Sequence, residues 1–116
     1  MPSYMFLIYG DESRLAEATD EDWAVMLQAH NAWQEQVTSS GAKVLEGAPL
    51  EASSTATSIR HGDAGPIVTD GPFAETKEAL GGYYVVECAD LDAALALARV
   101  LPGEGVEVRP VITIPS

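Results

Sequence analysis

The sequence predicts an α+β domain whose strands and helices follow the order β-α-β-β-α-β, with one further hairpin inserted in the middle. Two observations support this prediction. Apolar runs of strand length occur at 4–9 and 83–88, and each precedes a capping residue and a longer helical pattern. The 116 residues, 47% of them apolar and without a low-complexity run, are enough for a single domain spanning 1–116 with its own core.

The first strand and the first helix have clear boundaries. Residues 4–9 are apolar at every position, so both faces of this strand should be covered. Thr19 or Asp20 caps a helix that runs to about Ser40, and Asp22 stands at the acidic position of a capping box. The inner face of this helix is expected to carry Trp23, Met26, Leu27, His30, Trp33 and Val37.

The rest of the chain supplies the other strands and the second helix. Asp90 caps this helix, and Pro102-Gly103 ends it. The remaining strands are expected at 43–47, 83–88 and 106–111, and the inserted hairpin at 55–60 and 66–69 around the loop 61–65.

Without the hairpin, this order is that of the ferredoxin-like fold. Two helices cover only one face of such a sheet, yet the strands at 4–9 and 83–88 carry large apolar residues on both faces. The other face therefore needs a partner, and we expect a homodimer whose sheets pack face to face.

Composition excludes several classes of function. The 18 acidic and 6 basic residues give a formal charge of −12, which disfavours direct binding to nucleic acid and to anionic membranes. The single cysteine, Cys88, forms no internal disulfide and is expected in the core. The apolar run 4–9 is too short for export or for spanning a membrane, so the sequence indicates the cytoplasm.

No cofactor or metal is expected. The two histidines lie 31 residues apart among scattered carboxylates, which is not a metal-ligand spacing. The chain has no glycine-rich phosphate loop, no nucleophile elbow and no dinucleotide fingerprint.

Residues 70–82 form the most informative segment, because Asp70-Gly71-Pro72 alone would suffice for a turn. Asp70 is either a turn residue or a carboxylate that acts as a base, or that orients one. Phe73 is expected to plug the segment into the core, with the wall of a binding cleft as the alternative.

Further ionisable residues are candidates for the same site. Glu75 and Lys77 face the same way in an extended segment, so they form a surface ion pair, or Lys77 binds a carboxylate or enolate oxygen while Glu75 orients it. His30 is either a hydrogen-bonded core residue or a general base. Arg109 either points to solvent or pairs with an acid such as Asp11, and both residues are candidates for binding substrate.

The chain resembles the DGPF branch of the YCII-related family. The resemblance rests on Tyr9-Gly10-Asp11-Glu12, on residues 69–78 (Thr-Asp-Gly-Pro-Phe-Ala-Glu-Thr-Lys-Glu), on Gly81-Gly82-Tyr83 and on residues 106–111. It implies a dimeric α+β barrel and, for the wider family, an active site with a His-Asp pair. One relative in that family is a cofactor-free dehydrochlorinase, and the branch is often associated with extracytoplasmic-function sigma factors.

Two functional hypotheses follow. In the first, the protein is a dimeric enzyme that transfers protons on a small organic molecule without a cofactor, in a lyase or dehydrohalogenase-type elimination. Asp70, with or without His30, moves the proton, and Lys77 stabilises the oxyanion. In the second, the protein is a non-catalytic module that binds a ligand or a basic protein partner such as a sigma factor. A third reading makes the segment 70–82 a brace for the dimer.

Overall fold

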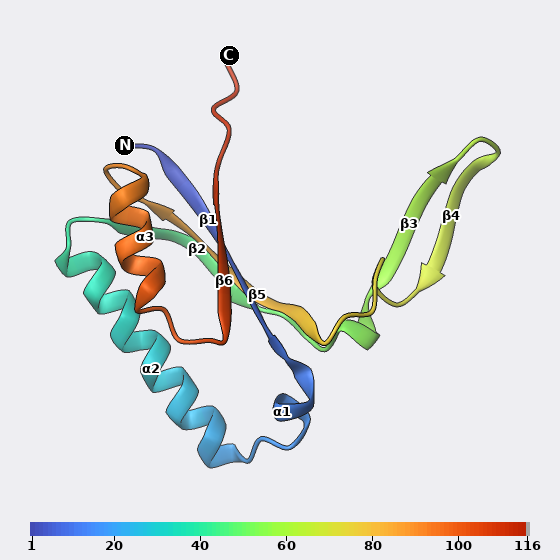
Figure 1. Cartoon of the computed structure of the whole chain (residues 1–116), viewed down its shortest axis with the longest axis horizontal. Helices are drawn as coiled ribbons and strands as arrows, with labels where there is room; N and C mark the ends of the chain where they lie inside the picture. The colour runs from blue at the N-terminus through green and yellow to red at the C-terminus, as the bar shows by residue number, and fades with distance from the viewer. Residues whose placement is uncertain (116) are drawn as a thin grey trace.

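A computed structural model of the chain describes residues 1–115. It contains a four-stranded antiparallel sheet, two longer helices on one face of the sheet, and a separate two-stranded hairpin (Figure 1). The elements are β1 (Ser3–Asp11), α1 (Glu12–Ala16), α2 (Asp20–Ser39), β2 (Lys43–Pro49), the 3₁₀ turn η1 (Ser53–Thr55), β3 (Thr57–Gly62), β4 (Gly65–Asp70), β5 (Glu78–Glu87), α3 (Leu91–Arg99) and β6 (Gly105–Pro110).

The large sheet has the strand order β2-β5-β1-β6. Each neighbouring pair is antiparallel, and β1 lies between β5 and β6. Together with α2 and α3, these four strands give the predicted order β-α-β-β-α-β, which is consistent with a ferredoxin-like fold. The predicted α+β class is therefore confirmed for the chain.

The core lies between the sheet and the two helices. Trp33 of α2 packs against Phe6 of β1 and Tyr84 of β5, with ring centroids 6.0 and 4.7 Å apart, and its indole Nε1 donates a hydrogen bond of 2.9 Å to the carbonyl of Leu97 in α3. Cys88 is buried here, as predicted, and burial raises the pKa of its thiol. The core cluster comprises Tyr4, Phe6, Trp33, Val37, Tyr84, Val86, Cys88, Ala94, Leu97, Ala98 and Leu101.

The capping box that begins α2 is present as predicted. The Thr19 hydroxyl accepts from the backbone N–H of Asp22, and the Asp22 carboxylate accepts from that of Thr19. The expected apolar stripe is only partly right, since Trp33 and Val37 are buried but Trp23 and Leu27 are exposed. The buried part of the stripe is therefore confined to the second half of α2.

Three local features differ from the expectation. A short helix, α1, follows β1 because the Asp11 side chain caps it. The strand expected at 83–88 begins earlier, at Glu78, because β1 also runs further and pairs Asp11 with Glu78. The hairpin loop has two residues, Asp63 and Ala64, since Gly62 already pairs with Gly65.

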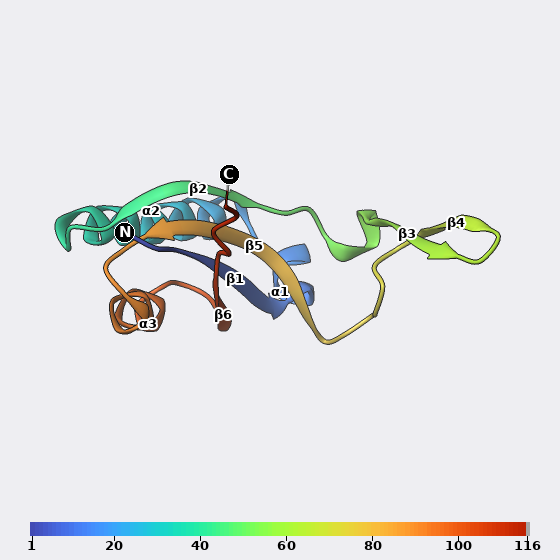
Figure 2. The ribbon, with the colours of Figure 1, turned by 90° about the horizontal axis from the view of Figure 1, so that it is seen from above.

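We call β3 and β4 together the arm, and residues 71–77 the connector. The arm projects away from the sheet and the helices (Figures 1 and 2). The radius of gyration is 16.4 Å, whereas a compact chain of this length has about 13 Å. The arm is therefore the main departure from a compact shape.

We call the sheet surface opposite α2 and α3 the open face. Met5 and Leu7 of β1 and Val85 of β5 alternate with core residues and lie partly exposed on this face. Both helices lie on the other side of the strands (Figure 1). Within one chain, the apolar residues on this face are thus left without the covering layer that the sequence analysis called for.

The stability of the sheet should depend on the absence of a side chain at Gly47. A Cβ there would lie 2.8 Å from Cε1 of Tyr84 and 3.0 Å from the carbonyl oxygen of Tyr83. Gly47→Ala should therefore lower the free energy of unfolding by about 1–3 kcal/mol, as overpacking does, measured by chemical denaturation at one protein concentration.

The matched control is Gly105→Ala, because a Cβ at Gly105 would meet nothing within 4 Å. This variant should unfold close to wild type. Equal losses for the two variants would contradict the packing of Tyr84 over Gly47.

Candidate functional site

A groove of about 570 Å³ lies where β1, β5 and β6 meet the connector. Tyr9 and Glu107 alternate along their strands with core residues, so both side chains belong to the open face. Gly105, directly opposite Tyr9, has no side chain to fill the space. The lining residues are Tyr9, Thr76, Glu78, Gly105, Val106 and Glu107.

Acid and base groups gather at the groove. It is lined by the carboxylates of Glu78 and Glu107 and by Tyr9, whose hydroxyl donates to Glu107 Oε1 at 3.4 Å. The connector enters β5 here, and the Thr76 hydroxyl donates to the carbonyl of Glu78. This arrangement offers proton acceptors and one phenolic proton donor to a small molecule.

Asp11 lies beside the groove, opposite Glu78 in the ladder. Its Oδ1 accepts hydrogen bonds from the Ser13 hydroxyl (2.7 Å) and from the Ser13 N–H (3.0 Å). These two bonds lower the pKa of Asp11 most, and the positive charges of Lys77 and Arg14 lower it further against the opposing effect of burial. Asp11 is therefore a carboxylate at neutral pH, and Lys77 lies within its electrostatic reach.

A second carboxylate braces this end of the sheet. Glu104 accepts from the backbone N–H of Asp11 at 2.9 Å and pairs with Arg14 at 2.7 Å. Arg109 does not pair with Asp11 and instead meets Glu107 on its own strand, at 3.3 Å. Both partners of that pair are largely exposed, so it contributes only about 0–1 kcal/mol.

The arm and the connector hold four of the predicted site residues, Asp70, Phe73, Glu75 and Lys77. Asp70 ends β4 opposite Thr57 and is exposed, as is Glu75 in the connector. The expectation that Phe73 is buried in the core is wrong, because 63% of the residue is exposed. Its ring lies against the guanidinium of Arg60, 4.6 Å from ring centroid to Cζ, since the arm carries this segment away from the core.

His30 lies on the helix side of the sheet. Its Nδ1 is hydrogen-bonded to the Tyr84 hydroxyl at 2.8 Å, and burial lowers the pKa of the imidazole. Asp70 lies in the arm and the groove lies on the open face. One subunit therefore does not bring His30, Asp70, Glu75 and Lys77 together.

Sequence reasoning missed Tyr9, Glu78 and Glu107. The alternation of Glu107 and Arg109 with Val106 and Val108 was the available signal for the open face. The groove itself requires β1 to lie between β5 and β6, which no local pattern reveals.

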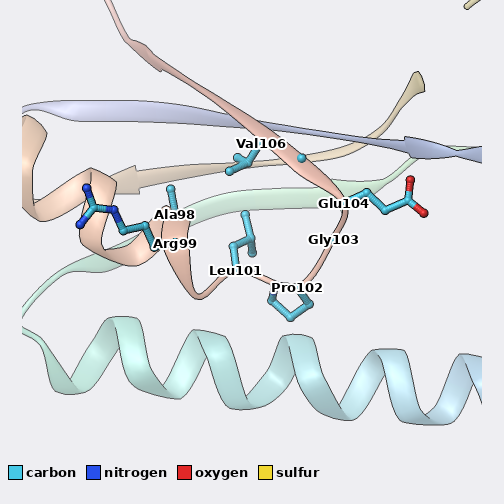
Figure 3. A pocket seen from close by; sticks show the side chains of 8 residues that line it. Ala98, Arg99, Leu101, Pro102, Gly103, Glu104 and Val106 are labelled. Atoms are coloured by element: carbon cyan, nitrogen blue, oxygen red, sulfur yellow. The ribbon is translucent and has the colours of Figure 1, made fainter. Parts of the chain in front are cut away.

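A smaller cavity of about 170 Å³ separates the end of α3 from β6. Figure 3 shows Ala98, Leu101, Pro102 and Val106 around it, with the charged ends of Arg99 and Glu104 pointing away in opposite directions. No polar groups converge here, so this crevice is a poor candidate for chemistry.

Residues 1–115, which the structure describes, show neither a metal-ligand cluster nor a membrane-spanning helix. In this part of the chain, no three His, Cys, Asp or Glu side chains gather closely enough to ligate a metal ion. Nor does any helix there combine the length and the apolar character that crossing a bilayer requires.

Comparison with known proteins gives two findings. The family model described as the YCII-related domain matches residues 3–115. An uncharacterised protein of Rhizobium meliloti (strain 1021) is 40% identical over 112 residues, which cover 92% of this chain and 90% of that protein.

Removing the imidazole of His30 should make the protein less sensitive to acid. Burial lowers the pKa of His30 below its usual 6.5, so the unfolded chain takes up this proton more readily than the folded one. The contribution of neutral His30 to stability is thus present above about pH 6.5 and lost as the pH falls through the folded pKa. The difference in unfolding free energy between wild type and His30→Gln should shrink from about pH 7.5 to about pH 5.

The matched control is His61→Gln, in the exposed end of the arm. It should follow wild type at both pH values. A constant difference between wild type and His30→Gln would contradict the desolvation of the His30 ring.

Proposed function

The chain belongs to the YCII-related family, and from this premise we propose that it is a dimeric, cofactor-independent enzyme of the DGPF branch that transfers protons on a small organic molecule. One observation carries the proposal. The groove surrounds a single space of about 570 Å³ with two carboxylates and a phenol, beside Asp11 and Lys77.

The dimer is proposed from the open face. Met5, Leu7 and Val85 form a partly exposed apolar centre on a sheet whose other face is already covered by α2 and α3. Packing two open faces together buries this centre and closes a two-layer barrel. The groove lies at the end of the same face, so a second sheet would roof it and exclude water.

The proposed chemistry begins with loss of a proton from carbon. The carboxylate of Glu78, which lines the groove, removes a proton next to a carbonyl or carboxyl group. The electron pair moves onto the carbonyl oxygen, where the Lys77 ammonium stabilises the negative charge. The enolate then expels a leaving group from the adjacent carbon, and Tyr9 is the available proton donor.

The other predicted residues take different parts in this proposal. Asp11 holds Lys77 electrostatically, and Arg109 sets the orientation of the Glu107 carboxylate. Asp70, Glu75 and Phe73 are given no part in the chemistry, because none of them lines the groove. His30 is left out, because its Nδ1 is engaged by Tyr84 on the helix side.

A second candidate is a non-catalytic module that contacts a basic protein such as a sigma factor. Its support is the exposed pair Trp23 and Leu27, one helical turn apart on α2 and away from the groove. Three acids, Asp20, Glu21 and Asp22, lie in the adjacent first turn. A basic partner with an apolar contact would suit this surface.

Proton transfer can be tested without knowing the product. Wild type is incubated in D₂O with a panel of small carbonyl and carboxylic acids, including compounds that carry a β-halogen or β-hydroxyl group. We expect deuterium incorporation at the carbon next to the carbonyl, or loss of the leaving group, by NMR. Lys77→Met should slow the reaction by about 10²–10³-fold, as loss of an oxyanion-stabilising group does.

The matched control is Lys43→Met, because Lys43 lies at the start of β2, opposite Glu87 and outside the groove lining. It should retain the wild-type rate. Absence of exchange and elimination across the panel, with an intact dimer, would reject the enzyme and favour the protein-binding module.

A further inference from the structure

The arm exposes apolar side chains on both of its faces. Ile59 and Val68 are directly opposite each other on one face, and 50% and 64% of these residues are exposed. Ile67, 58% exposed, lies opposite Arg60 on the other face. Such apolar pairs usually face a core or an interface. The arm therefore resembles an interface that nothing covers in the single chain.

The arm receives little support from its own subunit. Its two strands form a sheet of their own, apart from the four-stranded sheet. Hydrogen bonds close its base, from the Gly71 N–H to the Ala56 carbonyl (2.7 Å) and from the Ser58 hydroxyl to the Gly71 carbonyl (2.6 Å). A two-stranded hairpin alone is marginally stable in water, so a partner is needed to hold the outer part.

The exposed area has the size of a permanent interface. The chain exposes 8329 Å², about 2,200 Å² more than a typical folded protein of 12.3 kDa. Two chains that each covered this excess would bury roughly 4,400 Å² in total, which is in the range of obligate dimers. The open face and the arm are the surfaces that supply it.

Charge favours a second copy over a more basic partner at this surface. The arm and its loop carry one arginine, Arg60, against two acids, Asp63 and Asp70, in a chain of net charge −12. This nearly neutral element approaches another acidic subunit with little repulsion, whereas most other surfaces of two such chains repel each other. The two-fold symmetry of a homodimer then gives each subunit one arm and one receiving surface.

We propose that the arm is an exchanged contact, which lies against the body of a second copy and buries Ile59 and Val68 there. The inference rests on the dimer of the proposed function and adds the arm to its interface. Figures 1 and 2 show the arm projecting well clear of its own sheet, so the body of another subunit has room beside it.

The exchange also completes the groove. The connector joins the arm to β5, Thr76 lines the groove, and Lys77 is the next residue. An arm held by a second subunit fixes the far end of this seven-residue connector. The site of each subunit is thus ordered only in the dimer.

The test compares the same substitution at two exposed valines. Val68→Asp places a charge in the proposed contact, whereas Val100→Asp places it just after α3, on the helix side, where 49% of the residue is exposed. Sedimentation should show a dimer dissociation constant at least about 10-fold higher for Val68→Asp and unchanged for Val100→Asp. Ile59→Asp, on the same arm face, should repeat the effect.

Amide hydrogen exchange gives a readout that does not depend on a variant. The arm amides of wild type should be protected at high protein concentration and lose protection on dilution. The arm contact would be overturned if Val68→Asp and Ile59→Asp dimerise as tightly as wild type. It would also be overturned if the arm amides exchange equally fast in dimer and monomer. Either result would leave the sheet-to-sheet dimer standing. Equal weakening by Val100→Asp would also overturn it. A wild type that is monomeric throughout would overturn both.

Discussion

Trp33 joins all the layers of the domain. Its ring packs on Phe6 of β1 and Tyr84 of β5, and its indole N–H donates to the Leu97 carbonyl of α3. One side chain of α2 therefore contacts both central strands and the other helix. This position fixes which face of the sheet the helices cover, and thereby leaves Met5, Leu7 and the groove on the other face. The dimer proposed above rests on this uncovered face.

The fold could be predicted from the sequence because the patterns that indicate its elements involve residues close together in the chain. The Thr19–Asp22 capping box, the cap at Asp90 and the apolar run from Tyr4 to Tyr9 each depend on neighbouring residues only, and each lies where it was expected. The burial of Cys88 followed in the same way from the strand expected at 83–88, although β5 itself ends at Glu87. The early start of β5 at Glu78 was missed because pairing with Asp11 extends both strands, and pairing is not local.

The candidate site was less accessible for a related reason. Asp70, Phe73, Glu75 and Lys77 are close in sequence and were expected to converge, yet none of them lines the groove. Asp70 ends the arm, and Phe73 is exposed in the connector. The prediction that Phe73 is buried failed because large aromatic residues usually lie in the core, whereas this ring stacks on Arg60. Tyr9 and Glu107 meet only because β1 and β6 are neighbours. Contacts between distant strands decide both results.

The position of β1 in the sheet also determines how the chain folds during synthesis. Both neighbours of β1 come from the last third of the chain, and its Tyr4 pairs with Pro110. Because ribosomes add about 5–20 residues per second, β1 is synthesised roughly 5–20 s before β6, its neighbour at the edge of the sheet. Because β1 and β2 are not neighbours, the arm hairpin is the first strand pair that the growing chain completes. The apolar strand β1 therefore remains without either of its strand partners while most of the chain is synthesised.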